Sequence, residues 1–437
     1  MSSRRGSLWR HPDFLKLWIG ETVSQFGSQV TILAFPLTAA VVLDATPAEM
    51  GLLAALEMLP FLLISLPAGV WVDRLRRRPI LIAGDLVRGV ALLSVPLAGV
   101  AGVLSMPLLY GVAVVTGAAT VFFDVSYQSY LPALVDREHL IEGNSKLELS
   151  RSAAQTGGPG LGGVLVGLIG AAEAILFDAL SFFFSAVLLF AIRKPEPAPA
   201  PAAERRHMVH EIREGLGVVL GNPVLRAIAA TTATSNLFSS MSFATLFIFA
   251  TRDLALDGVR IGLAFALANV GAMIGAIVAG RIAGRIGIGN TLMAAIFIGS
   301  VGNVLVPLAQ PATALPLLVA AMFVFSATGT VYNINQVSLR QSITPDRLQG
   351  RMNASMRFIV WGVFPIGSLV GGALGTAIGV RAAIAVGAVG GLVTVVWLVF
   401  SPVRTLREPP PAWKAGAKPP GFLKPVGEAD PEASRPG

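Results

Sequence analysis

Long apolar runs separated by short polar segments make up most of this 437-residue chain. A helix needs roughly 20 consecutive apolar residues to cross the hydrocarbon core of a bilayer. The pattern predicts twelve transmembrane helices, at residues 14–43, 48–70, 79–102, 105–130, 143–170, 172–192, 222–251, 258–281, 289–310, 312–336, 350–379 and 381–402. We therefore expect an all-α membrane protein.

The predicted helices fall into two similar halves of six. Asp136-Arg137 followed by Asn144 matches Asp346-Arg347 followed by Asn353, and the spacing of four glycines also repeats: Gly158, Gly162, Gly163 and Gly170 match Gly367, Gly371, Gly372 and Gly379. Parallel halves of this kind are typical of transporters, whose substrate site forms near the midplane between the halves.

Two polar segments complete the predicted organisation. Residues 195–203 form an extended Pro/Ala stretch, and the segment after it predicts an interfacial helix, because Met208, Ile212, Leu216 and Val219 recur at helical spacing. We expect an N-terminal six-helix bundle at 1–192, a cytoplasmic linker at 193–221, a C-terminal six-helix bundle at 222–402 and a disordered cytoplasmic tail at 403–437.

Composition agrees with a membrane protein and excludes several other classes. Charged residues make up 13% of the chain, against roughly 25% in a soluble domain. The absence of cysteine excludes disulfides, thiolate zinc sites and iron–sulfur clusters, and we expect no cofactor. The net charge of +8 comes from basic residues between apolar runs rather than on one polar face, which does not indicate a nucleic-acid partner.

The basic residues predict the orientation, because Lys and Arg in short loops stay on the cytoplasmic side. One set of loops contains Arg74, Arg76, Arg77, Arg78, Arg137, Lys146, Arg151, Arg281, Arg285, Arg340, Arg347 and Arg351, and the opposite set contains only Arg252, Arg260 and Arg381. We therefore expect a multi-pass protein of the cell membrane with both termini in the cytoplasm.

Ionisable residues inside the predicted spans are the main functional candidates, because a charge in the membrane is costly and usually faces the bundle interior. Span one carries a polar stripe of Glu21, Ser24, Gln25 and Ser28, which we expect to line a cavity. The others are Glu57 in span two, Asp85 and Arg88 in span three, Asp124 in span four, Asp178 in span six and Arg357 in span eleven.

Carboxylates that change protonation with conformation suit proton coupling, for which Glu57 and Glu21 are the first candidates. All four histidines lie outside the predicted spans, so a histidine relay is not expected. The alternative for Asp85 and Arg88 is a structural ion pair, since they lie one turn apart. The alternative for Asp178 is a local capping or hydrogen-bonding role.

The second half offers mostly neutral polar groups. Asn236, Ser239, Asn269 and Asn335 lie in spans seven, eight and ten, and we expect them to contact substrate together with aromatic residues such as Trp361. Lipid contact or packing is the alternative for each aromatic.

Two motifs resemble one family of transporters. Gly69-Val-Trp-Val-Asp73-Arg74-Leu-Arg76-Arg77-Arg78, after span two, resembles the loop motif of the major facilitator superfamily. There the small residue allows close helix packing and the acid meets a helix N-terminus in one conformation, which here implies the start of span eleven as the partner. The alternative is that these arginines only determine topology. The matching position after span eight has Gly284 in place of the acid.

The second motif lies in span five. Gly158-Pro159-Gly160-Leu161-Gly162-Gly163 resembles the antiporter motif of drug and proton exchangers in the same superfamily, and close helix packing is its structural alternative. The surrounding sequence is similar to the macrolide-efflux and enterobactin-exporter branch, including Asp85-Leu-Val-Arg88, Tyr127-Gln-Ser-Tyr130-Leu-Pro132 and Phe177-Asp178-Ala-Leu-Ser-Phe182. This similarity covers almost the whole chain except its linker and tail. That resemblance implies an exporter that exchanges protons for a small amphiphilic compound, and we expect it to be a monomer.

Other functions fit less well. No lysine follows a glycine, so the phosphate-binding loop of an ATP-driven pump is absent, as are the GxSxG and HExxH motifs of enzymes. An importer or uniporter of a small metabolite on the same fold remains the principal alternative, and a membrane receptor that transports nothing is a further one.

Overall fold

The computed structural model describes residues 8–72, 75–196 and 208–408, and within these ranges every regular element is a helix. The predicted all-α class is therefore confirmed. The first bundle contains α1 (Pro12–Leu37) with its terminal π-helical turn η2 (Thr38–Val42), α2 (Pro47–Val72), α3 (Arg77–Val100), α4 (Met106–Leu134), α5 (Leu140–Ile169) and α6 (Ala171–Phe190).

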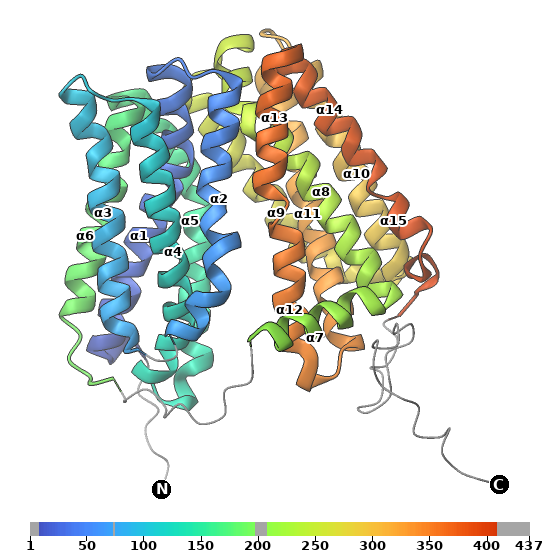
Figure 1. Cartoon of the computed structure of the whole chain (residues 1–437), viewed down its shortest axis with the longest axis horizontal. Coiled ribbons are helices and arrows are strands. Elements are labelled where there is room, and N and C mark those ends of the chain that lie inside the picture. Colours follow the sequence, from blue (N-terminus) through green and yellow to red (C-terminus); the bar gives the residue numbers. More distant parts are fainter. Residues whose placement is uncertain (1–7, 73–74, 197–207, 409–437) are drawn as a thin grey trace, which may run out of the picture.

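The second bundle lies beside the first (Figure 1). It contains α8 (Pro223–Ile248) with its terminal turn η4 (Phe249–Asp253), α9 (Gly258–Ile286), α10 (Ile288–Leu308), α11 (Ala314–Ile343), α12 (Asp346–Trp361), α13 (Phe364–Ile378), α14 (Val380–Val393) and α15 (Val396–Val399). Three short 3-10 turns, η1 (Leu8–Arg10), η3 (Arg137–His139) and η5 (Pro402–Thr405), complete the two bundles.

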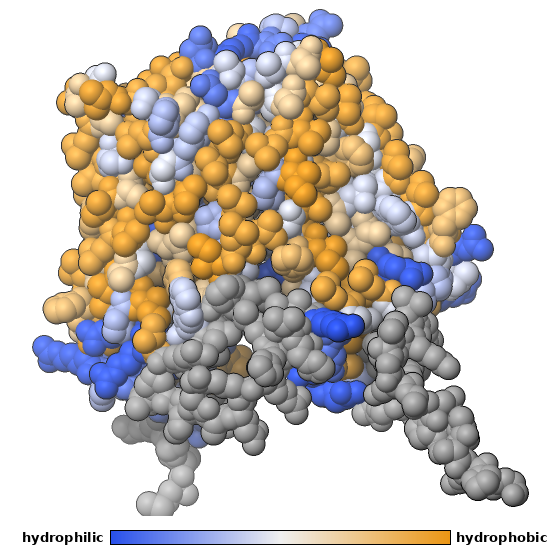
Figure 2. All heavy atoms as spheres, in the orientation of Figure 1, coloured by the Kyte–Doolittle hydropathy of each residue, from blue (hydrophilic) through white to orange (hydrophobic). Residues whose placement is uncertain are grey.

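Eleven helices in the described part of the chain are long and apolar enough to cross a membrane, with α12–α13 and α14–α15 each counted once. The helix outside this set is α5, whose glycines, Pro159 and Gln155 lower its mean hydropathy. It nevertheless packs against α1, α6 and α9 inside the assembly and takes the place of the twelfth span. On the face that Figure 2 shows, hydrophobic residues cover the middle and hydrophilic ones gather at the two ends.

The predicted span at 350–379 is interrupted in the structure. Helix α12 ends at Trp361 and α13 begins at Phe364. The cause lies in the sequence, because Pro365 has no N–H to donate to the carbonyl of Trp361.

The predicted linker helix exists as α7 (Met208–Gly221), with residues 205–207 outside the described part. It crosses one end of the second bundle (Figure 1) and packs against α12 and α8. Val218 and Val219 are buried there, and Glu214 forms an ion pair with Arg351. We call this end, where α1 also begins, the α7 end, and the opposite one the η2 end.

Residues 403–408, expected to begin a disordered tail, pack against the turn between α9 and α10. Val403 is fully buried, and the N–H groups of Ile288 and Gly289 donate to the carbonyls of Arg407 and Leu406 at 3.1 and 2.9 Å. The apolar side chains of Val403 and Leu406 give this segment enough packing to be ordered despite its polar composition.

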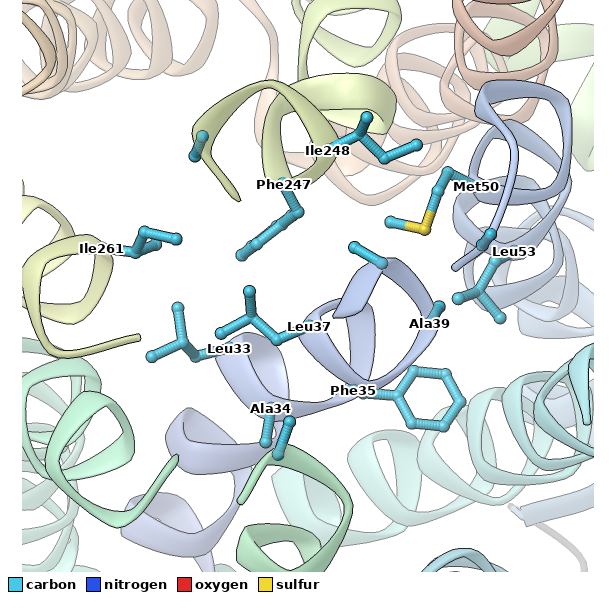
Figure 3. Close-up of a cluster of buried hydrophobic side chains, with 14 of the residues drawn as sticks. Leu33, Ala34, Phe35, Leu37, Ala39, Met50, Leu53, Phe247, Ile248 and Ile261 are labelled. Atoms are coloured by element: carbon cyan, nitrogen blue, oxygen red, sulfur yellow. The ribbon is translucent and has the colours of Figure 1, made fainter. Parts of the chain in front are cut away.

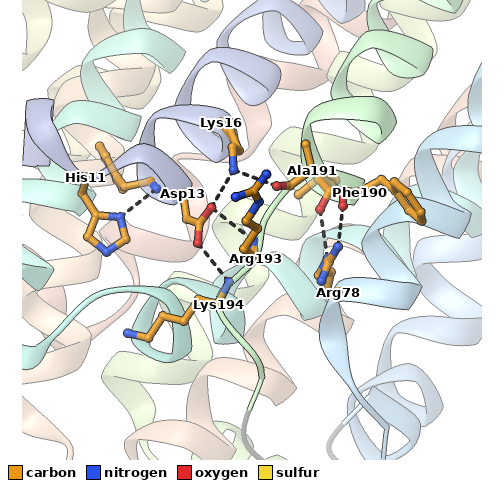
Figure 4. Close-up of polar contacts among 10 residues, drawn as sticks. His11, Asp13, Lys16, Arg78, Phe190, Ala191, Arg193 and Lys194 are labelled. Atoms are coloured by element: carbon orange, nitrogen blue, oxygen red, sulfur yellow. Dashed lines mark hydrogen bonds and ion pairs between the residues drawn. The ribbon is translucent and has the colours of Figure 1, made fainter.

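Hydrogen bonds tie the first bundle together at the α7 end (Figure 4). Asp13 accepts hydrogen bonds from the side chain of Lys16 at 2.8 Å and from the N–H groups of Arg193 and Lys194 at 3.2 and 2.9 Å. Arg78 donates to the carbonyls at the end of α6, Leu189 at 2.9 Å and Phe190 at 2.6 Å. The chain leaving α6 is thereby fixed to α1 and α3.

The two bundles meet at the η2 end in one buried apolar cluster. Leu33 and Leu37 from the first bundle lie opposite Phe247 and Ile261 from the second (Figure 3). Arg252 of η4 reaches across, donating to the carbonyls of Ala40 and Ala45 at 2.9 Å each and pairing with Asp44 at 2.8 Å. This end of the assembly is closed.

Two pairs of helices make close backbone contact across this boundary. A Cβ added at Gly372 of α13 would lie 2.7 Å from the carbonyl oxygen of Pro47 and 2.9 Å from the Cα of Gly51 in α2. A Cβ at Gly163 of α5 would lie 2.6 Å from the carbonyl oxygen of Gly258 in α9. Only glycine permits either approach, so these contacts determine how tightly the η2 end closes.

We predict that Gly372→Leu opens the η2 end, because the added side chain forces α2 and α13 apart at a cost of about 1–3 kcal/mol. The chain has no native cysteine, so Met50→Cys, at a position that is 3% exposed in this closed end, is a clean reporter. A membrane-impermeant maleimide should label Met50→Cys faster when Gly372→Leu is also present.

The matched control is Gly280→Leu on α9, where an added Cβ has no neighbour within 4 Å. Equal labelling rates in the Gly372→Leu and Gly280→Leu backgrounds would show that the glycine contact does not hold this end closed.

Candidate functional site

A cavity of about 1390 Å³ lies between the two bundles. The apolar cluster at the η2 end covers it, and its wall extends toward the α7 end as far as Arg340, less than one turn from the end of α11. The first bundle contributes Ile32, Ala54, Glu57, Met58, Phe61, Asp124 and Gln155 to the wall, and the second contributes most of the remainder.

Glu57 of α2 is one of two carboxylates in this wall. Its carboxylate makes no hydrogen bond or ion pair with any residue that the structure describes. Phe61 lies one turn further along α2, and its ring is 6.0 Å from that of Trp361 on α12. An unpaired carboxylate beside aromatic rings can accept a proton or bind a donor group of a ligand.

Asp124 of α4 is the other carboxylate. It lies within electrostatic reach of Arg88 on one side and of Arg357 in the second bundle on the other. The guanidinium of Arg357 lies over the ring of Trp361 at 5.5 Å. Asp124 therefore links the cavity to the interior of the first bundle.

Several neutral side chains predicted to contact substrate do line the cavity. They are Asn236, Ser239 and Asn269, together with Trp361 and the charged Arg357. The amides of Asn236 and Asn269 each donate to a carbonyl, of Val360 at 2.9 Å and of Phe265 at 3.1 Å, which fixes their orientation. Further rings, from Phe243, Phe265, Phe325 and Phe364, give this wall an apolar surface.

Asp85 and Arg88 form a buried ion pair inside the first bundle, at 2.5 Å. Asp85 is fully buried, and the guanidinium of Arg88 lies between the rings of Phe123 and Phe182, 4.1 Å from each. A guanidinium held between two aromatic faces and a carboxylate is well compensated for the loss of water.

Glu21 and Asp178 are also buried beside this pair. Glu21 is 7% exposed and accepts a hydrogen bond from Gln25 at 2.7 Å, and it lies within electrostatic reach of Asp85 and Arg88. Asp178 accepts from the hydroxyl of Ser181 at 3.1 Å. The polar stripe of span one thus turns its buried members, Glu21 and Ser24, toward the bundle interior.

Five predicted cavity residues, the four of the span-one stripe and Asn335, are not among the side chains that line the cavity. Within the stripe, Glu21 and Ser24 are buried and Gln25 and Ser28 are half-buried. Asn335 is buried, with its amide donating to the carbonyl of Val331 at 2.8 Å. The residues of α1 that reach a cavity wall follow the stripe, at Gln29, Ile32 and Leu33.

Sequence reasoning missed part of the second-bundle wall. Arg340 was expected in a cytoplasmic loop, but α11 extends to Ile343 and carries Arg340 into the cavity wall. Gln336 lies one turn before Arg340 on the same face, and this spacing could have indicated that the helix continues to Arg340. Asn303 and Asn353 also line the wall and were not predicted to contact substrate.

The glycines of the predicted antiporter motif pack helices rather than line the main cavity. Gly158 and Gly162 face Gln29 and Val30 of α1, and Gly163 meets α9. Pro159 lies in a smaller pocket with Gln29 and Asn269, also between the bundles. This motif therefore lies where the halves touch.

The predicted loop motif is only partly visible. Asp73, Arg74 and the surroundings of Gly69 lie outside the described residues. The backbone N–H groups of Arg77 and Arg78 donate to the carboxylate of Glu196 at 2.8 and 3.1 Å. The basic end of the motif thus binds the segment that follows α6.

Known proteins with similar sequences are transporters. The family model of the Major Facilitator Superfamily matches residues 17–365 and 231–428. The multidrug efflux pump Tap of Mycolicibacterium fortuitum is 26% identical over 378 residues, which cover 82% of this chain and 87% of that protein. Tap of Mycobacterium tuberculosis (strain ATCC 25618 / H37Rv) is 25% identical over 384 residues, which cover 85% and 89%.

Solved structures show the same fold at lower identity. A bacterial homologue of the iron transporter ferroportin in its inward-facing state superposes with a TM-score of 0.74 at 16% identity, covering 90% of this chain and 99% of that one. The nucleoside transporter NupG gives 0.69 at 12% identity, covering 89% and 98%. Since the family model spans most of the sequence, the chain belongs to the major facilitator superfamily, and it is a membrane transporter and not an enzyme.

Proposed function

We propose that this transporter exports a small amphiphilic compound in exchange for protons by alternating access. The observation that carries the proposal is Glu57, a carboxylate without a protein partner among the described residues, in the wall of a closed-ended cavity between two bundles. A proton and a donor group of the substrate would compete for this carboxylate, so binding of one promotes release of the other.

The direction of transport is supported by similarity. Both Tap proteins are multidrug efflux pumps and match more than four fifths of this chain. The aromatic rings of the cavity suit a compound with an apolar surface, and its neutral amides suit hydroxyl or carbonyl groups.

The same proposal includes the membrane topology. Arg226, Arg281, Arg285 and Arg404 are exposed at the α7 end of the second bundle, which favours that end as the cytoplasmic one. The structure would then be inward-facing, with its cavity closed on the outer side. We further propose a monomer in the cell membrane, divided into bundles at 1–192 and 222–402 by the linker at 193–221, with its tail beyond 402.

We predict that Glu57→Gln abolishes transport driven by a pH gradient. A compound found by drug-susceptibility and thermal-shift screening should accumulate in everted membrane vesicles with an acidic interior, because protons leaving the vesicle drive it inward. Glutamine keeps the size of the side chain but does not titrate, so accumulation should cease while expression and the unfolding temperature stay unchanged.

Glu49→Gln is the matched control, since Glu49 lies on the same helix but outside the cavity wall, where its carboxylate accepts hydrogen bonds from Thr46 at the helix start. It should transport normally. Uptake into intact cells at an undiminished rate in Glu57→Gln would favour an importer or uniporter. Proteoliposomes that show no flux of any ligand that stabilises the protein would favour a receptor.

We also predict that Asp85 and Arg88 hold the first bundle together rather than couple protons. Asp85→Ala leaves an arginine that stays charged and buried, which should destabilise the protein by about 3–5 kcal/mol. Asp85→Ala combined with Arg88→Leu should recover much of that loss in thermal unfolding, and should still accumulate substrate along a pH gradient. A stable double variant without pH-driven transport would instead make this pair part of the coupling.

A further inference from the structure

The second-bundle wall of the cavity contains two buried polar atoms without a partner. Arg340 and Gln336 lie one turn apart on α11 and both line the cavity. The Nε of Arg340 and the Oε1 of Gln336 are buried and have no hydrogen-bond partner within the described residues. Gln336 is only 4% exposed, and its Nε2 already donates to Asn333 at 2.9 Å.

Such atoms are costly unless something binds them. A buried donor or acceptor left without a partner loses roughly 1–3 kcal/mol relative to a paired one. The two atoms here are complementary in kind, because the guanidinium donates and the amide oxygen accepts. A ligand that satisfies both must present an acceptor and a donor about one helical turn apart or closer.

Charge decides which acceptor fits best. The second-bundle side chains of the wall include Arg340 and Arg357 and no carboxylate, whereas the first bundle supplies Glu57 and Asp124. Arginine keeps its charge under all physiological conditions, while carboxylates can be neutralised by protons. The second-bundle wall is therefore permanently positive, and Arg340 makes no ion pair within the part of the chain that the structure describes.

We propose that Arg340 and Gln336 form a subsite for an acidic group of the transported compound. A carboxylate or similar anion binds the guanidinium through paired charge-assisted hydrogen bonds, and a hydroxyl or N–H next to the acid donates to the Gln336 oxygen. An α-hydroxy acid or an N-acyl amino acid has this arrangement, and its apolar part would lie against the aromatic rings. The inference rests on the proposed transport function, of which it specifies the substrate class.

Four dansyl compounds separate the parts of this proposal, because they share one fluorophore. Dansylamide carries no acid, dansylglycine carries a carboxylate next to an N–H, dansylsarcosine carries the same carboxylate with the N–H methylated, and dansylcadaverine carries an amine. Their binding to the full-length protein in phosphatidylcholine nanodiscs is measured by fluorescence. Wild type should bind dansylglycine about tenfold or more tightly than dansylamide.

Arg340→Gln should lower the affinity for dansylglycine to that for dansylamide. Dansylamide and dansylcadaverine should bind as in wild type, and their unchanged affinity shows that the variant is folded. Arg340→Lys should give an intermediate preference, since it keeps the charge but loses the planar fork. Gln336→Met should bring dansylglycine down to the affinity of dansylsarcosine and leave dansylsarcosine unchanged.

Equal binding of dansylglycine and dansylamide by wild type would overturn the subsite, as would a preference that survives Arg340→Gln. These readings do not depend on flux. A protein that keeps the Arg340-dependent preference but shows no proton-driven transport would refute the exporter proposal and leave the subsite standing.

Discussion

Polar side chains within a membrane-spanning bundle must be paired with one another or must face a cavity, because hydrocarbon offers no hydrogen bonds. The two bundles satisfy this constraint differently. In the first, Arg88 is held by Asp85 and two aromatic rings, and Asp178 and Glu21 have hydrogen-bond donors beside them. Among the described residues, the charged side chains without a hydrogen bond or ion pair that line the cavity are Glu57 and Asp124 in the first bundle and Arg340 and Arg357 in the second. The candidate site is therefore formed by the charged side chains that other side chains do not pair.

The fold could be predicted because its causes are local and repetitive. Apolar runs of sufficient length specify the helices, and the repeated glycines identify the duplication before any contact is known. The small residues at Gly163 and Gly372 then occupy equivalent contacts between the halves, one against α9 and one against α2. A contact that only glycine permits can be inferred from the glycines in the sequence, whereas a contact between larger side chains cannot.

The site was less predictable, for two physical reasons. The stripe on α1 was identified correctly as a polar face, but the sequence of one helix does not show which helices pack against it. Glu21 lies near Asp85 and Arg88 of α3 and Asp124 of α4 and does not line the cavity. Arg340 was assigned to a loop because a charge ends an apolar run, although it does not end a helix. The helix continues to Ile343 because a cavity wall, unlike a lipid-facing surface, accepts an arginine inside a span.

In the proton-driven export that we propose, the unequal distribution of charge separates two tasks of the transporter. Carboxylates in the first-bundle wall can be protonated, so the charge of that wall depends on the pH on the side to which the cavity is open. Guanidinium groups in the second-bundle wall keep their charge, so that wall can bind the same chemical group of the substrate whether or not the carboxylates are protonated. Because the walls belong to bundles that touch at the η2 end, a ligand bound to both would resist their separation. Protonation of one wall weakens that bridge without altering recognition by the other, which gives exchange a structural basis that a symmetric cavity would lack.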